Sequence, residues 1–174
     1  MNFCSEGHGL AYFHAMMTVL VEREDSQYSH RNTMVAIDGE QLVGIAVSYY
    51  GGQLHQLRIP FIKMAQEYLG KDHFGINDET QKGELYLDSL AVKPEYRLRG
   101  IARQLIEATR QRAINEGLPS VGLLVDCNNP DGLALYQSCS FDYVNDNIWG
   151  GHHMKTSHFP LPSNENYTII TLVP

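Results

Sequence analysis

The chain has 174 residues, of which 43% are hydrophobic and 19% are charged, and its formal net charge is −7. These values are typical of a single globular domain with a sizeable core, and we expect one domain spanning residues 1–174. The acidic balance argues against a nucleic-acid partner, and no apolar run approaches the ~20 residues of a membrane helix. Three cysteines without metal-ligand spacing and no recognisable signal peptide favour a cytoplasmic protein.

The first half of the chain predicts a helix, a hairpin and a second helix. An apolar stripe over residues 7–25 indicates the first helix. Two β-rich runs, residues 32–38 and 41–50, flank a glycine-bearing turn and predict a β-hairpin. A second helical pattern follows the glycines at 51 and 52 and runs to about Leu69. It contains Pro60, which we expect to kink or split the helix. Residues 70–83 are polar and predict a loop.

A strand, a tight loop and a helix follow. Residues 85–92 predict a buried strand, and the sequence Arg97-Leu98-Arg99-Gly100-Ile101-Ala102 leads into a helix. The unpaired N–H groups and the dipole of a helix start attract anions, Gly100 allows close approach to the backbone, and the arginines suit phosphate. Between Lys93 and Arg112 there are six basic and two acidic residues, a local excess of four positive charges. This excess indicates either a bound polyanion or a solvated basic helix face.

The remaining residues predict a second buried strand, a helix and closing strands. In residues 118–126, Val121, Leu123 and Val125 share one face of a strand. Asn129 or Asp131 can cap the helix that follows, with Pro130 in its first turn. Residues 141–147 and 148–156 predict two closing strands, and residues 167–173 form a last β-rich run.

Two of these motifs resemble those of the GNAT acetyltransferase superfamily. Arg97-x-x-Gly100-x-Ala102, after a strand ending Leu90-Ala91-Val92, is similar to the pyrophosphate-binding motif of that family. A second signature is matched by Asn129, Gly132, Leu135 and Tyr136, with Ser140-Phe141 in place of the usual Gly-Phe. The resemblance covers residues 33–155.

The resemblance implies a fold of the α/β (α+β) class. Its sheet is mixed and mostly antiparallel, with helices on both faces, and a parallel strand pair, residues 85–92 and 121–126, splays apart. It also implies a strand before the first helix, which residues 1–5 do not provide. The helix and loop at about 52–82 are then an insertion, either a wall of the substrate site or a structural addition.

The resemblance further implies that acetyl-CoA binds as the acetyl donor. The residues expected to hold it are Leu90, Ala91, Val92, Arg97, Leu98, Arg99, Gly100, Ile101, Ala102, Arg103, Asn129 and Tyr136. No metal is expected, because the adjacent His152 and His153 on a strand would point to opposite faces.

Acetyl transfer to an amine requires a neutral amine, a polarised thioester and protonation of the departing thiolate. The resemblance places Tyr136 beside the sulfur, as the acid. Alternation along the central strand puts Glu84, Tyr86, Asp88 and Leu90 on one face. Asp88 and Glu84 are therefore the candidates for the base, and a water wire or a plain ion pair are the alternatives.

Two classes of function remain open from the sequence. The first is an N-acetyltransferase that moves the acetyl group of acetyl-CoA to a primary amine by direct attack in a ternary complex. The second is a non-catalytic acyl-CoA-binding or regulatory module on the same fold. Tyr136 and the strand carboxylates favour the enzyme, whose acceptor is a small-molecule or peptide amine. The sequence leaves the identity of the amine and the existence of a homodimer open.

Overall fold

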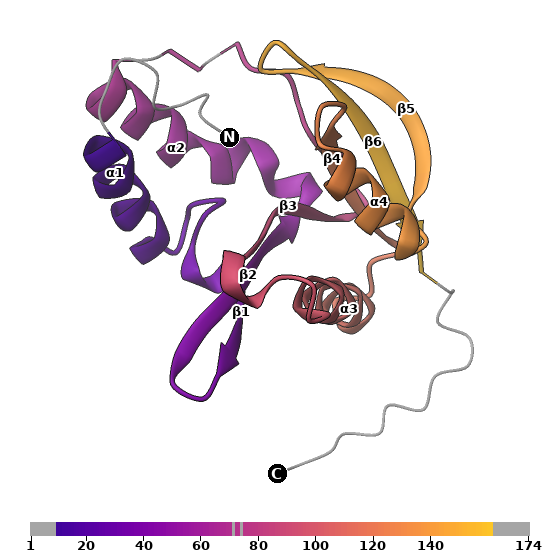
Figure 1. The fold of residues 1–174 in the computed structure, drawn as a ribbon. Coiled ribbons are helices and arrows are strands. Elements are labelled where there is room, and N and C mark those ends of the chain that lie inside the picture. The colour runs from indigo at the N-terminus through magenta and orange to yellow at the C-terminus, as the bar shows by residue number, and fades with distance from the viewer. Residues whose placement is uncertain (1–9, 71, 74, 162–174) are drawn as a thin grey trace.

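The computed structural model describes residues 10–161 except residues 71 and 74. Six strands form one sheet in the order β1-β2-β3-β4-β6-β5 (Figure 1). All neighbours are antiparallel except β3 and β4. This confirms the mixed, mostly antiparallel sheet. The strands are β1 (Thr33–Asp38), β2 (Gln41–Tyr50), β3 (Leu85–Val92), β4 (Ser120–Asp126), β5 (Asp142–Trp149) and β6 (His152–Pro160).

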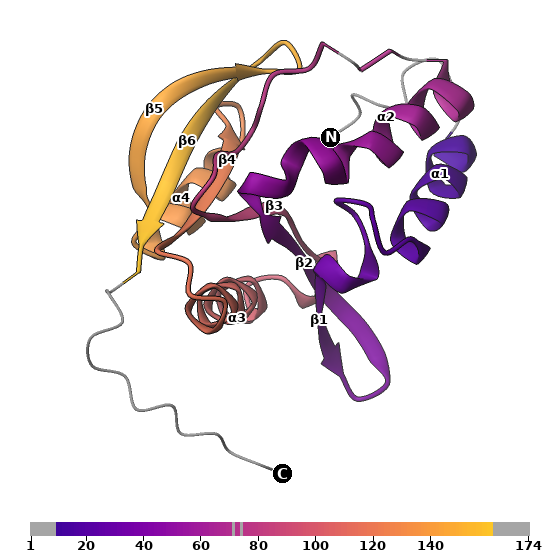
Figure 2. The same cartoon turned by 180° about the vertical axis from the view of Figure 1, so that it is seen from behind.

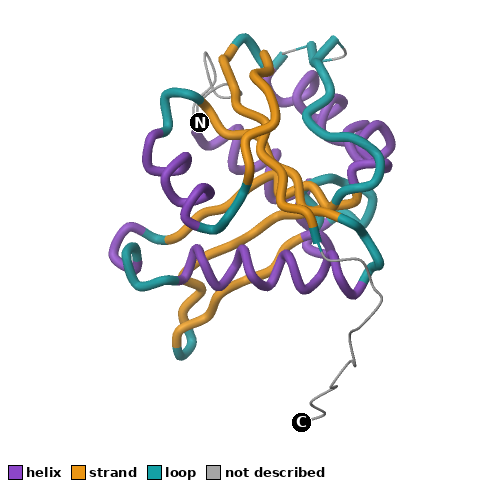
Figure 3. The backbone as a smooth tube through the Cα atoms, turned by 90° about the vertical axis from the view of Figure 1, so that its right-hand side faces the viewer, coloured by secondary structure: helices purple, strands orange, loops and turns teal. Residues whose placement is uncertain are grey.

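Helices cover both faces of the sheet. The described helices are α1 (Leu10–Glu22), α2 (Leu54–Leu69), α3 (Ile101–Asn115) and α4 (Pro130–Ser138). Helices α1 and α2 lie together on one side of the sheet and α3 lies on the other, as the two opposite views show (Figures 1 and 2). Seen from the side, α3 runs along its face of the sheet (Figure 3). None of the helices in the described ranges is long and apolar enough to cross a membrane.

Each face has its own apolar core. On the α3 side, Leu105 and Ile106 pack with Leu85, Leu87 and the strand residues of β4, among them Val121, Leu123 and Val125. On the other side, α1 and α2 pack on each other through a cluster that includes Met16, Leu20 and Phe61. A third cluster joins Leu54 of α2 to Tyr49 and Tyr86 of the sheet. These contacts fix the helices around the centre of β3.

The two parallel strands separate after a short paired stretch. Strands β3 and β4 pair only at Leu85 with Val121 and at Tyr86 with Gly122. The expected splay is therefore confirmed. Beyond these pairs, β3 and β4 have no hydrogen-bonded register with each other, and the gap opens toward the end of β3 that leads into α3.

Several predicted boundaries were wrong. Ile148 and Trp149 belong to β5, because the chain turns at Gly150 and Gly151, both of which have positive φ. Helix α1 ends at Glu22, and α2 is one helix with Pro60 inside it, so the predicted split does not occur. The fourth strand begins at Ser120, not at residue 118. The predictions for residues 1–5 and 167–173 concern segments outside the described residues.

Candidate active site

A β-bulge lies at the centre of β3. In the antiparallel register of β2 and β3, Val47 pairs with Ser89 and Ser48 pairs with Leu87, so Asp88 has no partner across the ladder. Such a bulge changes which face the following side chains occupy. Leu90 packs with the α3-side core, whereas Tyr86 packs with the cluster on the α2 side. The prediction that Leu90 shares a face with Tyr86 was therefore wrong.

The carboxyl group of Asp88 is held in an apolar, hydrogen-bonded setting. Ser89 Oγ donates a hydrogen bond of 2.6 Å to Asp88 Oδ2. Burial raises the pKa of Asp88 to about 7, and the charge of Glu79 adds to the rise, while the bonds from Ser89 and Gln27 and the charge of Arg58 oppose it. A carboxyl group with a pKa near neutrality is suited to accept a proton at physiological pH.

The segment between α1 and β1 brings Gln27 to Asp88. The N–H of Gln27 donates to Leu57 O of α2 at 2.9 Å, and Asn32 Nδ2 donates to Ser26 O and Gln27 O at 3.0 and 3.2 Å. Gln27 is 3% exposed, and its side chain lies near the carboxyl group of Asp88 and helps to lower the pKa of that group. Its Oε1 has no hydrogen-bond partner among the described residues. No local pattern in the sequence indicates a role for this residue, which lies in an irregular segment.

A buried ion pair ties residues 76–79 to α2 and the sheet. Arg58 of α2 donates to Glu79, and also to Ile76 O and Asn77 O at 3.3 and 3.2 Å. Glu79 accepts further bonds from Tyr49 Oη at 3.0 Å and from Trp149 Nε1 at 2.9 Å. The side chains of Arg58 and Glu79 are 6% and 3% exposed. The segment is thus fastened at once to α2, β2 and the end of β5.

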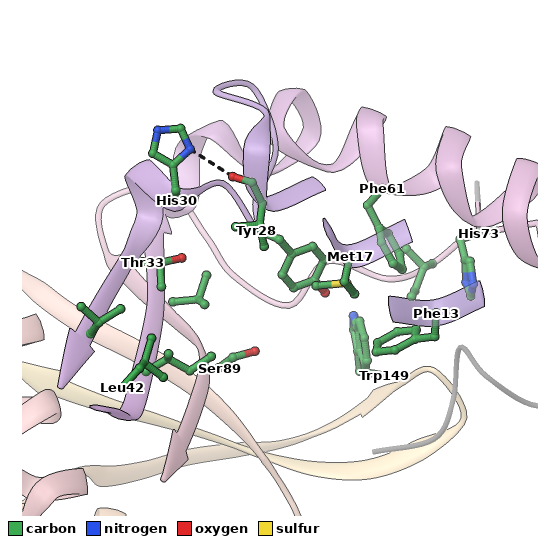
Figure 4. Close-up of a pocket in the computed structure, with 15 residues that line it drawn as sticks. Phe13, Met17, Tyr28, His30, Thr33, Leu42, Phe61, His73, Ser89 and Trp149 are labelled. Carbon is green, nitrogen blue, oxygen red and sulfur yellow. Dashed lines mark hydrogen bonds between the residues drawn. The ribbon is translucent and has the colours of Figure 1, made fainter. Parts of the chain in front are cut away.

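A cavity of about 470 Å³ opens between these elements (Figure 4). Ser89 lies on one wall, between the hairpin residue Leu42 and Trp149 of β5 (Figure 4). Most of the lining is aromatic or aliphatic and includes Phe13, Met17, Val47, Phe61, Ile76 and Trp149. The polar lining comes from Tyr28, His30, Thr33, His73 and Ser89. The residue beside the bulged Asp88 therefore faces a space of ligand size.

Glu84, the second candidate base, has a different setting. Its Oε1 accepts bonds from Thr80 Oγ1 at 2.6 Å and from the N–H of Gln81 at 3.1 Å. Its carboxylate also lies directly over Gly122, where a Cβ would come within 2.2 Å of Oε2. These contacts close the turn into β3 and attach it to β4. They are those of a structural residue, and Glu84 does not line the cavity.

The loop before α3 has the features of an anion site. Leu98 and Gly100 have φ values of 59° and 82°, and no side chain caps the start of α3. The N–H groups of the first turn of α3 are therefore open to a ligand. Arg97 Nε donates to Val92 O at 3.3 Å and Arg99 Nη2 to Glu95 O at 2.9 Å, so both exposed arginines are anchored beside the loop. The loop lies at the end of β3, on the side where β3 and β4 have separated.

Three of the six basic residues of the predicted positive excess join α3 to other elements. Arg103 donates to Ser138 O and Ser138 Oγ at 2.9 and 3.0 Å, which joins α3 to α4. Arg110 lies 3.6 Å from the ring centre of Phe159 and bonds to Cys139 O. Arg112 donates to Ser48 O of β2 at 2.8 Å. The charge suited to a polyanion is thus concentrated at Lys93, Arg97 and Arg99, which are exposed.

The second motif forms the start and the inner side of α4. Asn129 caps the helix, because its Oδ1 accepts the N–H of Gly132 at 2.9 Å. A Cβ at position 132 would lie 2.6 Å from Asn129 Nδ2, which explains the glycine. Tyr136 packs edge-on against Phe141, and its hydroxyl has no hydrogen-bond partner in the part of the chain that the structure describes. Burial raises the pKa of Tyr136 to about 12, so the phenol stays protonated.

The histidines of β6 do not line the cavity. His152 Nδ1 lies 3.1 Å from Asp126 Oδ2, an exposed pair at the end of β4. Within residues 10–161, apart from 71 and 74, no group of three or more His, Cys, Asp or Glu side chains is arranged to hold a metal ion. Cys127 is exposed and Cys139 is buried, and neither forms a disulfide.

Comparison with known proteins identifies the protein family. The sequence profile of the acetyltransferase (GNAT) family matches residues 6–141. A segment of 72 residues, 41% of this chain, is 38% identical to mycothiol acetyltransferase of Kocuria rhizophila, and it spans 23% of that relative.

Solved structures agree with the fold. A crystal structure of an acetyltransferase superposes with a TM-score of 0.74 at 23% identity, over 92% of this chain and 85% of that one. A protein from Bacillus anthracis, solved with acetyl coenzyme A, superposes with a TM-score of 0.53 at 14% identity, over 74% and 61% of the two chains.

The chain belongs to the GNAT family of acetyltransferases. The GNAT fold is one that uses acetyl-CoA as the acetyl donor. Acetyl transfer to amine acceptors is the activity of the family.

Proposed function

We propose that this protein transfers the acetyl group of acetyl-CoA to a primary amine by direct attack within a ternary complex, with Asp88 as the base. The observation that carries the proposal is the bulge in β3. It places a carboxyl group of pKa about 7 beside a ligand-sized cavity and next to the gap between β3 and β4.

The donor site is supported by three features that lie in sequence along β3 and α3. The splayed strands leave backbone groups unpaired, which suits the amide-bearing arm of CoA. The uncapped start of α3 and the exposed Arg97 and Arg99 suit its pyrophosphate. Beyond Tyr86, the edge of β3 that faces β4 has no partner strand, and a backbone N–H on this edge can polarise the thioester carbonyl.

Tyr136 is the proposed partner of the leaving thiolate. With a pKa of about 12 it is a weaker acid than a thiol of pKa ~8.5, so complete proton transfer is uphill by roughly 3 to 4 pKa units. Its free hydroxyl instead stabilises the thiolate by donating a hydrogen bond. The proton released by the amine passes to Asp88, whose folded-state pKa suits it to receive one.

Initial-rate kinetics test the proposal. We expect acetyl-CoA to be consumed only with an amine present, and double-reciprocal plots at several amine concentrations to intersect. Parallel plots together with an acetyl group trapped on the enzyme, for instance on the exposed Cys127, would contradict direct attack. Tight binding of acetyl-CoA without turnover of any amine would instead favour the non-catalytic module.

A further inference from the structure

The cavity beside Ser89 differs from the site that a polycationic acceptor requires. Among the described residues, those that line it include no Asp, Glu, Lys or Arg. Its walls are built mainly from aromatic and aliphatic side chains of α1, α2, the β1–β2 hairpin and Trp149 (Figure 4). Two carboxyl groups bond directly to residues that line the cavity, that of Asp88 to Ser89 and that of Glu79 to Trp149 Nε1. The charge of Glu79 is already paired with Arg58, so Asp88 is the carboxyl group left for a ligand.

Electrostatics limit the number of amino groups that this cavity can accept. An ammonium group transferred into an apolar cavity loses its hydration, and the cost is recovered only where a counter-charge or hydrogen-bond acceptors face it. The Asp88–Ser89 side supplies acceptors for one amino group, and the buried Oε1 of Gln27, which has no partner in the described chain, is a further acceptor beside Asp88. A second or third ammonium group of the same ligand would lie against Phe13, Met17 or Phe61.

The size and the polar groups of the cavity define the rest of the ligand. A volume of about 470 Å³ lies within the range of roughly 300–1,000 Å³ found for small-molecule sites. Trp149 is held by its bond to Glu79, and Phe61 packs against His73 with ring centres 5.5 Å apart, so these aromatic walls are fixed in place. Fixed aromatic walls favour a ligand with an apolar, ring-sized body.

From this arrangement we infer that the acceptor is a small primary monoamine with an aromatic or bulky aliphatic body, and not a polyamine or an aminoglycoside. The inference rests on the proposed N-acetyltransferase function and specifies its acceptor. The amino group points to Asp88 and Ser89, and the apolar body occupies the space between Met17, Phe61 and Trp149.

The test compares 2-phenylethylamine, ethylamine and spermidine as acceptors, with product detected by mass spectrometry and rates corrected for the fraction of neutral amine. We expect kcat/KM for 2-phenylethylamine to exceed that for ethylamine by roughly tenfold or more, because the ring is buried only in the first complex. Spermidine should be the poorest of the three. A preference for spermidine, or equal values for ethylamine and 2-phenylethylamine, would overturn the inference while leaving the acetyltransferase function intact.

Two matched variants locate the binding site. Met17→Trp fills the cavity from α1, whereas Met64→Trp changes a half-buried methionine of the same α1–α2 cluster that does not line it. Met17→Trp should lower kcat/KM for 2-phenylethylamine by about tenfold or more with an unchanged Kd for acetyl-CoA, and Met64→Trp should change neither by more than about twofold. Thermal melting of both variants verifies that they fold. Equal losses in the two folded variants would overturn the assignment.

A binding measurement separates failure of the inference from failure of the proposed function. Calorimetry with 2-phenylethylamine and the CoA-bound protein reports on the cavity without turnover. If no amine is acetylated but 2-phenylethylamine binds to wild type and not to Met17→Trp, the proposed function fails and the apolar amine site stands. If 2-phenylethylamine neither binds nor reacts while spermidine is acetylated, the proposed function stands and the inference is wrong.

Discussion

The hydroxyl group of Ser89 donates a hydrogen bond of 2.6 Å to Oδ2 of Asp88, and these adjacent residues lie at the bulge in β3. In a regular strand neighbouring side chains point to opposite faces. The bulge breaks this alternation and allows the two groups to act at one place. A serine on the cavity wall is in this way linked to a carboxyl group of raised pKa.

Replacing Asp88 by Asn should lower kcat/KM by about 10²–10⁴-fold at neutral pH, the usual cost of removing a general base. Wild-type kcat/KM should rise with pH up to about 7 as Asp88 becomes ionised. This rise should be absent from the pH profile of the variant. The defect should shrink toward high pH, because the amine then arrives neutral. A pH-independent defect confined to the KM of the amine would make Asp88 a binding residue and return the base role to Glu84 or to water.

The same carboxyl group should leave a signature in stability. The folded-state pKa of Asp88, about 7, is above the ~3.9 of an unfolded aspartate, so between these values the folded protein holds a proton that the unfolded chain has lost. Stability therefore falls as pH rises from about 4 to about 7, by up to about 4 kcal/mol. Asp88→Asn should remove this decline and be more stable than wild type at about pH 8. Urea unfolding across this range tests it, with the exposed Asp142→Asn as the control, which should follow wild type.

Tyr136→Phe should lower kcat substantially while the Kd for acetyl-CoA changes by no more than about twofold. The change removes one hydroxyl group that has no partner in the described chain and keeps the edge-on packing against Phe141. Burial raises the pKa of Tyr136 to about 12, so the phenol stays protonated up to about pH 10. The kcat of wild type should therefore not fall with rising pH in this range because of Tyr136. Unchanged kcat in a variant whose chemical step is rate-limiting would assign Tyr136 to packing.

Gly100→Asp should weaken acetyl-CoA binding by about tenfold or more, because it places a carboxylate at the start of α3, where the pyrophosphate is expected. Position 100 also has a φ of 82°, so backbone strain must be separated from charge. Gly39→Asp is the control, since Gly39 has a φ of 61° in the β1–β2 turn and a Cβ added there would meet no other atom within 4 Å. Calorimetry should find normal binding in Gly39→Asp, and wild-type affinity should fall as salt rises.

Glu79→Gln should destabilise the protein by about 3 kcal/mol, because it leaves the buried guanidinium of Arg58 without its main counter-charge. Asp78→Asn is the matched control. Asp78 pairs with the same arginine at 3.3 Å, but its side chain is 49% exposed, so its loss should cost about 1 kcal/mol or less. If urea unfolding shows that both variants lose the same free energy of unfolding, the buried pair with Glu79 stabilises the protein no more than the exposed pair with Asp78.

Local patterns in the sequence were sufficient for most of the fold. The boundaries of β3 and the start of α3 follow from an apolar run, a proline and a glycine-bearing loop, all of them local signals. The bulge could not be predicted, because it depends on how β3 is aligned with β2, a strand some forty residues earlier in the chain. Counting alternate residues past position 88 therefore assigned Leu90 to the wrong face.

The surroundings of the site were harder to predict for the same reason. Arg58 and Glu79 belong to a helix and to an irregular segment, and nothing in either local pattern indicates that they meet. Arg110 and Arg112 fit an anion site by charge alone, but their side chains contact Cys139, Phe159 and Ser48, which are distant in sequence. Charge counts along a helix do not distinguish arginines that face solvent from those that hold elements together.

The separation of β3 from β4 also links the stability of the protein to its metabolic surroundings. Past Tyr86 and Gly122 the two strands no longer pair with each other, although both lie near the centre of the sheet. A donor molecule seated between them would complete hydrogen bonding that the chain leaves open, and it would bind the native state alone. At a concentration of a hundred times its Kd, such a ligand raises the free energy of unfolding by about 2.7 kcal/mol. We therefore expect the lifetime of this protein in a cell to rise and fall with the supply of acetyl-CoA.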